Sequence, residues 1–317
     1  MKEVVISSQE QNQRIDKYVR KYLENAPLSY IYKIFRKKDV KVNGKRVKED
    51  YILQVDDLVQ IYVSDDDYNK FAKDSKCIEY KQEFDVVYED SNILIVNKPV
   101  GLEVQEENKN NLTSQVLTYL KNKGEYDPNV NVGFKPSPAH RLDRNTSGLV
   151  IFGKNMLALQ ELNVCFKTRE GIDKYYLALV AGVTKNSELL SFPLLKNEKL
   201  KLVKVDFEKG LPAKTQYKKV SNNQDFSLIE VKLLTGRTHQ IRVHMSYIGH
   251  PLIGDEKYGD FSLNKRFKSE YNYRFQFLHA YKLQFHDLSG VLKYLNGKEF
   301  IAPMPKEKKD ILSKLGF

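Results

Sequence analysis

The sequence predicts an α+β protein in which a small helix-then-strand module precedes a larger domain built on a mixed, mainly antiparallel sheet. Its 317 residues correspond to about two domains, and a hydrophobic fraction of 41% is enough for two cores. Beyond residue 84, the expected strands outnumber the helices and lack the regular βαβ alternation of a doubly wound sheet. We expect a first module over residues 1–65, a linker over 66–82 and a large domain over 83–317.

The first module is predicted to begin with two helices. Apolar residues recur at helical spacing over residues 14–23, and after Pro27 a second helix is expected, with Ser29 as its N-cap. The acidic segment that starts at Ser64 shows little periodicity, which favours a linker there.

A basic hairpin is expected to follow these helices. Residues 40–47 alternate around Asn43-Gly44, a strong hairpin turn signal, and residues 58–63 have the pattern of another strand. The cations cluster at the end of the second helix and on the hairpin. This clustering favours a phosphate-binding surface over the alternative of a charged face that only contacts solvent. The candidate phosphate-binding residues are Lys37, Lys38, Lys41, Lys45 and Arg46.

The large domain is predicted from short apolar runs and two helices. Asn155 is expected to cap one helix, and another follows Gly236 and closes at Gly249. The expected strands are residues 93–98, 149–152, 175–180 and 227–234.

Composition excludes several classes of protein. No run of about 18 apolar residues could cross a membrane, and the N-terminus lacks the pattern of a secretory signal, so we expect a cytoplasmic protein. Cys77 and Cys165 form no CxxC, which argues against a disulfide scaffold or a zinc knuckle. The net charge of +11 and the pI of about 9.2 favour a polyanionic partner.

The most unusual stretch is His140-Arg141-Leu142-Asp143-Arg144-Asn145-Thr146-Ser147-Gly148. It places one acid between two arginines, just before a buried strand. A nearby guanidinium keeps a carboxylate ionised, and such a carboxylate can act as a nucleophile or a base. The alternative is a structural or turn aspartate held by an ion pair.

A second candidate lies at the strand-to-helix turn of residues 235–244. Arg237 and Arg242 add positive charge beside a helix N-terminus, where phosphate binds favourably. His239 and His244 are five residues apart, and no glutamate follows the first, so we expect no metal site.

The third candidate is the pair Tyr175-Tyr176 in a predicted strand, where alternation places one ring on each face and lets one of them stack on a base. No GxGxxG, Walker or complete GxSxG motif is present, so neither a nucleotide cofactor nor a hydrolase built on Ser147 is expected.

Together these segments resemble the RluA-type pseudouridine synthases over about residues 84–305. Five motifs match in order: residues 87–102, 140–148, 174–182, 236–250 and 277–280. The first module resembles the alpha-L RNA-binding domain that is often joined to these enzymes, although Gln54-Val55-Asp56-Asp57 stands where that domain usually has Gly-Asp.

The resemblance implies an enzyme that isomerises specific uridines in large-subunit (23S) ribosomal RNA to pseudouridine without a cofactor. It is closest to the RluC subgroup, on the segments 193–197, 258–260 and 302–304. An RluD-type synthase with different sites, or a non-catalytic ribosome assembly factor, is the alternative. We expect a monomer that binds ribosomal RNA and holds no metal.

Carried over to this sequence, the family implies Asp143 as the catalytic residue and Arg242 as the arginine that pairs with it. Tyr176 matches the active-site tyrosine, which stacks on the uracil or takes its proton. The implied RNA-binding residues of this domain are Arg141, Arg144, Arg237, His239 and Leu278.

Overall fold

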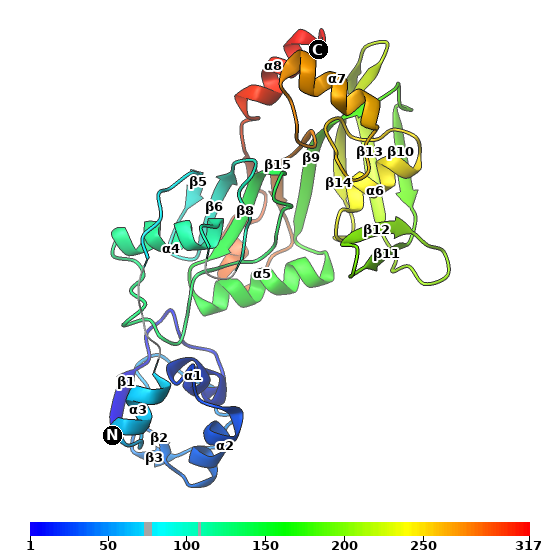
Figure 1. Ribbon diagram of the computed structural model, residues 1–317. Coiled ribbons are helices and arrows are strands. Elements are labelled where there is room, and N and C mark those ends of the chain that lie inside the picture. The colour runs from blue at the N-terminus through cyan, green and yellow to red at the C-terminus, as the bar shows by residue number, and fades with distance from the viewer. Residues whose placement is uncertain (73–77, 107–108) are drawn as a thin grey trace.

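The computed structural model describes residues 1–72, 78–106 and 109–317 and contains two main sheets with separate hydrophobic cores (Figure 1). The smaller sheet is antiparallel, in the order β1-β4-β2-β3. It comprises β1 (Lys2–Val5), β2 (Val40–Val42), β3 (Lys45–Arg46) and β4 (Leu58–Ile61), with the helices α1 (Ile15–Tyr22), α2 (Leu28–Arg36) and α3 (Asp65–Phe71).

The expected hairpin is confirmed, because Asn43 and Gly44 take the positive φ values of 50° and 76° that its tight turn needs. Ser29 is not the N-cap of α2: Pro27 occupies that position, and no side chain caps this helix. Pro27 fits there because it has no N–H to satisfy and the helix begins directly after it.

The start of the expected linker is helical. Ser64 caps α3 by accepting a hydrogen bond from the amide of Asp67 at 3.1 Å, and three acidic residues fill the first turn, where the helix dipole favours them. Phe71 is buried in the smaller core, so that core draws on residues beyond position 65. Residues 73–77 of the expected linker, with Cys77, lie outside the described residues.

The large sheet is mixed and mainly antiparallel, as predicted. Its order is β10-β13-β14-β9-β15-β8-β6-β5, with β16 on β15 and β7 on β8, and β15 pairs with β8 in parallel. Its strands are β5 (Asp85–Glu89), β6 (Ile93–Lys98), β7 (Ser137–Pro138), β8 (Ser147–Gly153), β9 (Ile172–Ala181), β10 (Ser187–Ser191), β13 (Lys214–Asn222), β14 (Phe226–Leu233), β15 (Leu278–Phe285) and β16 (Glu299–Ile301); a separate hairpin consists of β11 (Leu194–Asn197) and β12 (Leu202–Val205).

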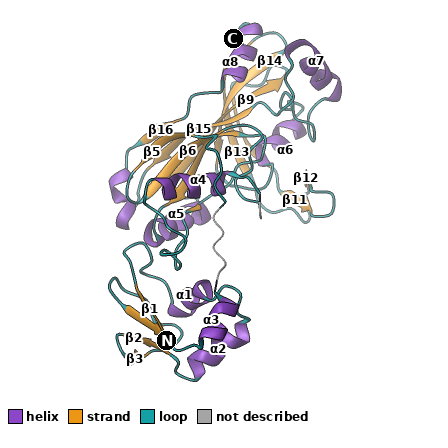
Figure 2. Cartoon of the chain, turned by 60° about the vertical axis from the view of Figure 1, so that its left-hand side comes forward, coloured by secondary structure: helices purple, strands orange, loops and turns teal. Residues whose placement is uncertain are grey.

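Helices cover both faces of this sheet (Figure 2). Leu94 and Val96 of β6 point into one core with α4 and α6, whereas Ile93 and Ile95 point into another with α5 and the 3-10 helix η1. Burial on both faces explains why the first four residues of β6, 93–96, form a continuous apolar run. The helices are α4 (Leu112–Asn122), α5 (Met156–Thr168), α6 (Gln240–Tyr247), α7 (Phe261–Tyr271), η1 (Gly290–Leu295) and α8 (Lys306–Lys314); within the described chain, none could span a membrane.

The smaller sheet and its helices contact the large domain around Gly133. The Gly133 amide donates to Glu10 Oε1 at 2.7 Å, and its carbonyl accepts from Gln13 Nε2 at 3.1 Å and Lys21 Nζ at 2.7 Å. A Cβ at this position would lie 2.1 Å from the ring of Tyr18. Glycine therefore lets the two parts approach closely enough to form these hydrogen bonds, which we call the Gly133 contact.

We predict that Gly133→Ala loosens this contact. Overpacking of this kind costs about 1–3 kcal/mol, which makes separation of the two parts about five- to 150-fold more frequent. Hydrogen exchange should therefore accelerate at the amide of residue 133, whereas Val130→Ala, an exposed change in the same loop, should leave it unchanged. Unaltered protection in the Gly133→Ala variant would contradict this role for the glycine.

Candidate active site

A cavity of about 420 Å³ opens where the loop before β8, strand β9 and the start of α6 meet. It brings together most of the candidate residues of the large domain, which are far apart in the sequence. Those that line it are Arg141, Asp143, Tyr176, Arg237, His239, Arg242 and Leu278. We call this cavity the pocket.

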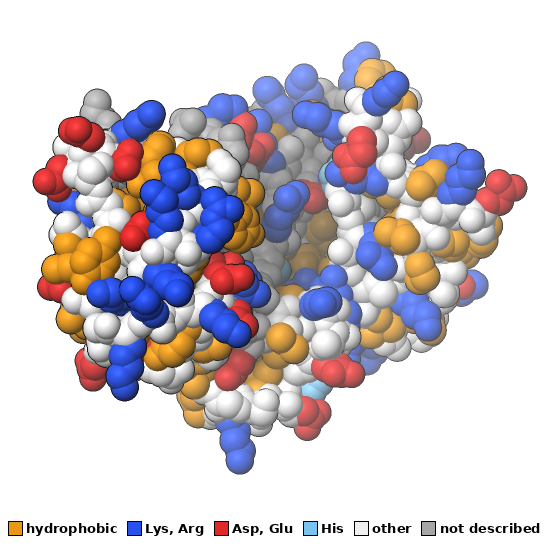
Figure 3. Space-filling view, turned by 90° about the horizontal axis from the view of Figure 1, so that it is seen from below, with side chains coloured by type: hydrophobic (Ala, Val, Ile, Leu, Met, Phe, Trp, Pro, Cys, Tyr) orange, Lys and Arg blue, Asp and Glu red, His pale blue; other side chains and the backbone are white. Residues whose placement is uncertain are grey.

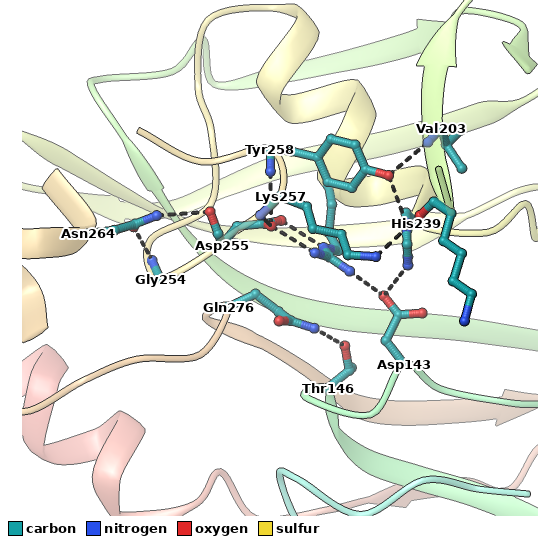
Figure 4. A network of polar contacts seen from close by, with 12 residues as sticks. Asp143, Thr146, Val203, His239, Gly254, Asp255, Lys257, Tyr258, Asn264 and Gln276 are labelled. Carbon is teal, nitrogen blue, oxygen red and sulfur yellow. Dashed lines mark hydrogen bonds and ion pairs between the residues drawn. The ribbon is translucent and has the colours of Figure 1, made fainter. Parts of the chain in front are cut away.

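Asp143 and Arg242 form an ion pair at the pocket, and Figure 4 shows Asp143 and Asp255 within one network of polar contacts. Arg242 Nη1 donates to Asp143 Oδ2 at 2.9 Å, and the side chain of Asp143 remains 28% exposed. The ion pair thus involves one carboxylate oxygen, while the carboxylate as a whole stays accessible from the pocket. The pair therefore leaves part of the carboxylate free to contact a molecule in the pocket.

The guanidinium of Arg242 is fixed by Asp255, a buried residue that the sequence did not indicate. Arg242 Nε and Nη2 each donate to one oxygen of Asp255 at 2.7 Å, and the amides of Lys257 and Tyr258 also donate to this carboxylate. Burial lowers the pKa of Arg242, but the hydrogen bonds and charges of Asp255 and Asp143 outweigh it and raise that pKa above its ordinary value. The bidentate geometry sets the direction of the third donor, which points at Asp143.

His239 stands beside this pair as the N-cap residue of α6, in a left-handed conformation with φ of 54°. Its Nδ1 lies 2.8 Å from the hydroxyl of Tyr258, which accepts from the Val203 amide, and its Nε2 lies 3.8 Å from Asp143 Oδ2. Burial lowers the pKa of His239 despite the charge of Asp143, so the ring is neutral at neutral pH. The contact with Tyr258 thus orients the imidazole with its Nε2 toward Asp143.

Tyr176 lies in the middle of the large sheet, where β9 pairs it with Val231 and Ala280. It is buried and lines the pocket, whereas the ring of Tyr175 lies 4.3 Å from Lys282 Nζ, away from the pocket. The expected alternation of the two tyrosines is therefore confirmed. Burial, followed by the charge of Asp143, raises the pKa of Tyr176, which keeps its phenol protonated.

The segment that follows β6 fixes the position of the loop that carries Asp143. Lys98 is fully buried, and its Nζ donates to the carbonyls of Pro99, Leu102 and Arg144. The side chain of Arg144 donates to the carbonyl of Gly101 at 3.0 Å, so the structure does not bring this candidate residue into the pocket. The segment 98–102 therefore braces the Asp143 loop.

Glycine is required where this loop enters β8. Gly148 has φ of 121°, and a Cβ there would lie 2.2 Å from the carbonyl oxygen of Ala280. This close approach allows β8 to pair in parallel with β15 immediately after the loop that carries Asp143.

The pocket is strongly cationic. Lys174 lies two residues before Tyr176 on the same face of β9, and burial, with the charge of Arg169, lowers its pKa to about 7. Lys174 and Arg169 were not among the candidate site residues: Lys174 opens the tyrosine motif without a role assigned to it, and Arg169 lies at the end of α5, outside every motif. The lining cations are Arg141, Arg169, Lys174, Lys196, Arg237 and Arg242, against the single carboxylate of Asp143.

The candidate cations of the first module lie outside the pocket, at the end of α2 and on the β2–β3 hairpin. They are exposed except for Lys41, which is half-buried and has its Nζ 4.7 Å from the centre of the Tyr62 ring. The structure thus places Lys37, Lys38, Lys41, Lys45 and Arg46 near one another in the fold but does not join them to Asp143.

The remaining polar groups suit neither a metal site nor a serine hydrolase. Ser147 Oγ lies 3.0 Å from His279 Nδ1, but both residues are fully buried, and His279 Nε2 faces the carbonyl of Ala302. His244 faces the carbonyl of Phe192 and does not share a site with His239. Across the residues that the structure describes, no group of three or more His, Cys, Asp or Glu side chains could hold a metal ion.

Comparison with known families matches residues 92–247 to the RNA pseudouridylate synthase family. An uncharacterized RNA pseudouridine synthase of Mycoplasma capricolum is 37% identical over 95% of this chain and 97% of its own length. The ribosomal large subunit pseudouridine synthases C of Vibrio vulnificus and Escherichia coli are 35% and 33% identical, covering 86% and 99% of this chain and 84% and 97% of theirs.

Two solved structures share the fold. Human RNA pseudouridylate synthase domain containing 4 superposes with a TM-score of 0.58 at 22% identity, over 73% of this chain and 92% of its own. Human RNA pseudouridylate synthase domain containing 1 gives a TM-score of 0.53 at 23% identity, over 75% and 97%.

We predict that Asp255→Asn destabilises the protein strongly. It leaves the guanidinium of Arg242 buried without a full counter-charge, and breaking such a pair costs about 3–5 kcal/mol. Urea unfolding should show this loss, whereas Asp260→Asn, which changes an exposed carboxylate five residues away, should lose no more than about 1 kcal/mol. Equal losses in both variants would contradict the anchoring role of Asp255.

We also predict a pH-dependent contribution from Lys174. Its pKa is about 7 when folded and its ordinary value is 10.5, so the unfolded chain binds more protons between these values and stability rises with pH there. Between pH 7 and pH 9, the free energy of unfolding of the wild-type protein should rise by about 1 kcal/mol or more relative to that of the Lys174→Met variant. A difference that does not change with pH would contradict the lowered pKa.

Proposed function

Because this chain belongs to the RluA-type RNA pseudouridine synthases, we propose that it isomerises specific uridines of large-subunit ribosomal RNA to pseudouridine, in the manner of the RluC subgroup. The observation that carries the proposal is the accessible Asp143 carboxylate, held by Arg242 in a cationic pocket that Tyr176 also lines. The relatives named ribosomal large subunit pseudouridine synthase C supply the substrate class.

The reaction that we propose begins with a uridine that leaves its base stack and enters the pocket, a step that costs a few kcal/mol and less in loops. Asp143 assists the departure of the base, either by attacking the sugar or by abstracting a proton from it. The base then turns and forms a bond to the sugar through its C5 carbon in place of N1. The proton on C5 is lost and N1 gains one, so the isomerisation balances without an oxidant, a reductant or a cofactor.

Tyr176 and Leu278 would form the apolar walls around the uracil. The raised pKa of Tyr176 keeps the phenol protonated, which supports stacking on the base rather than acceptance of its proton. Four exposed cations at the pocket, Arg141, Arg169, Lys196 and Arg237, would neutralise the phosphates on either side of the target nucleotide.

The first module would add affinity for RNA in the manner of an alpha-L domain. Its exposed cations at the end of α2 and on the β2–β3 hairpin can pair with phosphates without any contact to the reacting base. One copy of the chain supplies every residue that this mechanism uses, so we propose a monomer that acts on ribosomal RNA in the cytoplasm.

The proposed function predicts that particular pseudouridines of large-subunit RNA disappear in cells that lack this protein and return on complementation with wild type. Mass-tagged mapping of pseudouridine measures this directly and identifies the positions. Positions unlike those of RluC-type enzymes would favour the RluD-type alternative. An unchanged map together with a defect in ribosome assembly would overturn the enzymatic proposal in favour of a non-catalytic assembly factor.

Two of the pocket arginines, Arg242 and Arg237, should differ in their effects. Arg242 holds Asp143, so Arg242→Gln should lower kcat about 100-fold or more, as the loss of a charge-stabilising group does. Arg237 is exposed and donates to the carbonyl of Pro212 at 3.1 Å, so Arg237→Gln should raise KM for RNA and leave kcat within about threefold. Steady-state kinetics separates the two outcomes, and the reverse pattern would contradict these assignments.

A further inference from the structure

A second cavity, of about 700 Å³, lies between the first module and the large domain. Helix α1 forms one wall, with Lys17, Arg20 and Lys21 at the i, i+3 and i+4 positions of one helical face and Glu24 in the turn after the helix. The opposite wall consists of the segment 126–137 and the start of α5. We call this cavity the inter-module groove.

The Gly133 contact holds the two walls of the groove together. Lys21 Nζ donates to the carbonyl of Gly133 and, at 2.9 Å, to Gln13 Oε1, while the amide of Met156 at the start of α5 donates to the carbonyl of Gln9. These hydrogen bonds run from α1 and the segment before it to both parts of the opposite wall. The groove is therefore a defined surface of the folded chain.

The lining of the groove suits a polyanion with flat apolar groups. Lys17, Arg20, Lys21 and Lys135 provide four cations against the single carboxylate of Glu24. Lys17 and Arg20 are exposed, and the structure records no ion pair for either within the described chain. Two half-buried apolar side chains, Met156 and Leu159, lie beside them on the opposite wall, where Phe134 is buried behind the surface. Sites for single-stranded RNA combine cations, which pair with phosphates, with neighbouring apolar surfaces, which contact the bases.

Two segments of the chain connect the groove with the pocket. Helix α5 contributes Leu159 to the groove, and toward its other end Phe166 and Arg169 line the pocket, about 10 and 15 Å further at 1.5 Å per residue. The chain that leaves the groove at Ser137 reaches the pocket at Ala139. Figure 3 shows the molecule hollowed between two bodies, with Lys and Arg side chains on the walls of the hollow.

We propose that the inter-module groove binds the single-stranded RNA that flanks the target uridine, with Lys17 and Arg20 on its phosphates. This inference rests on the proposed function for the identity of the pocket. A pocket of about 420 Å³ has room for a nucleotide but not for the strand on both sides of it, so a neighbouring stretch must lie on the adjoining surface. The site is distinct from the basic hairpin, which lies beyond α2 in the first module.

The test uses the full chain and a fluorescein-labelled oligouridylate of about 12 nucleotides, with the dissociation constant measured by anisotropy over a range of salt concentrations. Lys17→Gln/Arg20→Gln should weaken binding about tenfold at low salt and reduce the slope of log K against log salt by about 1.4, because two phosphate contacts are lost. Lys265→Gln/Lys268→Gln removes the same charge from exposed positions on α7 and should change neither quantity. With 4-thiouridine in the oligonucleotide, the wild-type chain should crosslink within α1 or the segment 126–137.

An unchanged affinity and slope in the Lys17→Gln/Arg20→Gln variant would overturn the proposal and favour a protein as the binding partner of the groove. An equal loss in the α7 control would also overturn it, because the effect would then be one of total charge. Pseudouridine formation by the wild-type chain is measured separately on ribosomal RNA. If that reaction is absent while oligouridylate binding still depends on Lys17 and Arg20, the proposed function is wrong but the groove is still an RNA-binding site.

Discussion

The buried ion pair between Arg242 and Asp255 is the constraint on which the pocket depends. A guanidinium removed from water needs a counter-charge, and Asp255, itself fully buried, supplies it in a bidentate geometry. Two of the three donor nitrogens are thereby occupied, and the third is directed at Asp143. One arginine thus joins a buried acid, which fixes its position, to a partly exposed acid, which lines the pocket. The two carboxylates differ in role because they differ in exposure.

The rest of the fold brings the two halves of this arrangement together. Asp143 lies on a loop whose position is fixed by the hydrogen bond from Lys98 to the carbonyl of Arg144 and by the close approach of Gly148 to β15. Arg242 lies on the first turn of α6, whose apolar side packs against the core on one face of the sheet. The sheet therefore acts as a rigid support for two groups that are 99 residues apart in the sequence. Precise placement of this kind is what catalysis by position requires.

Local patterns in the sequence predicted much of this fold, and long-range contacts account for what they missed. The hairpin at Asn43-Gly44 and the cap at Asn155 follow from neighbouring residues alone, and both are present. Asp143, Tyr176 and Arg242 were found because each lies in a recognisable motif. Asp255 lies in a turn without a distinctive pattern, and its significance comes from a guanidinium that folding brings to it. The docking of Tyr18 against Gly133 joins residues more than a hundred positions apart, which no local periodicity can reveal.

The most direct test of the account is single-turnover pseudouridine formation by the Asp143→Asn variant on ribosomal RNA, with RNA binding measured on the same samples. Asparagine preserves the shape of the side chain but removes the charge and the nucleophilic oxygen. The account predicts that RNA binds with nearly the wild-type affinity and that no pseudouridine forms. Product formation at a rate comparable to wild type would show that the carboxylate held by Arg242 does not carry the chemistry.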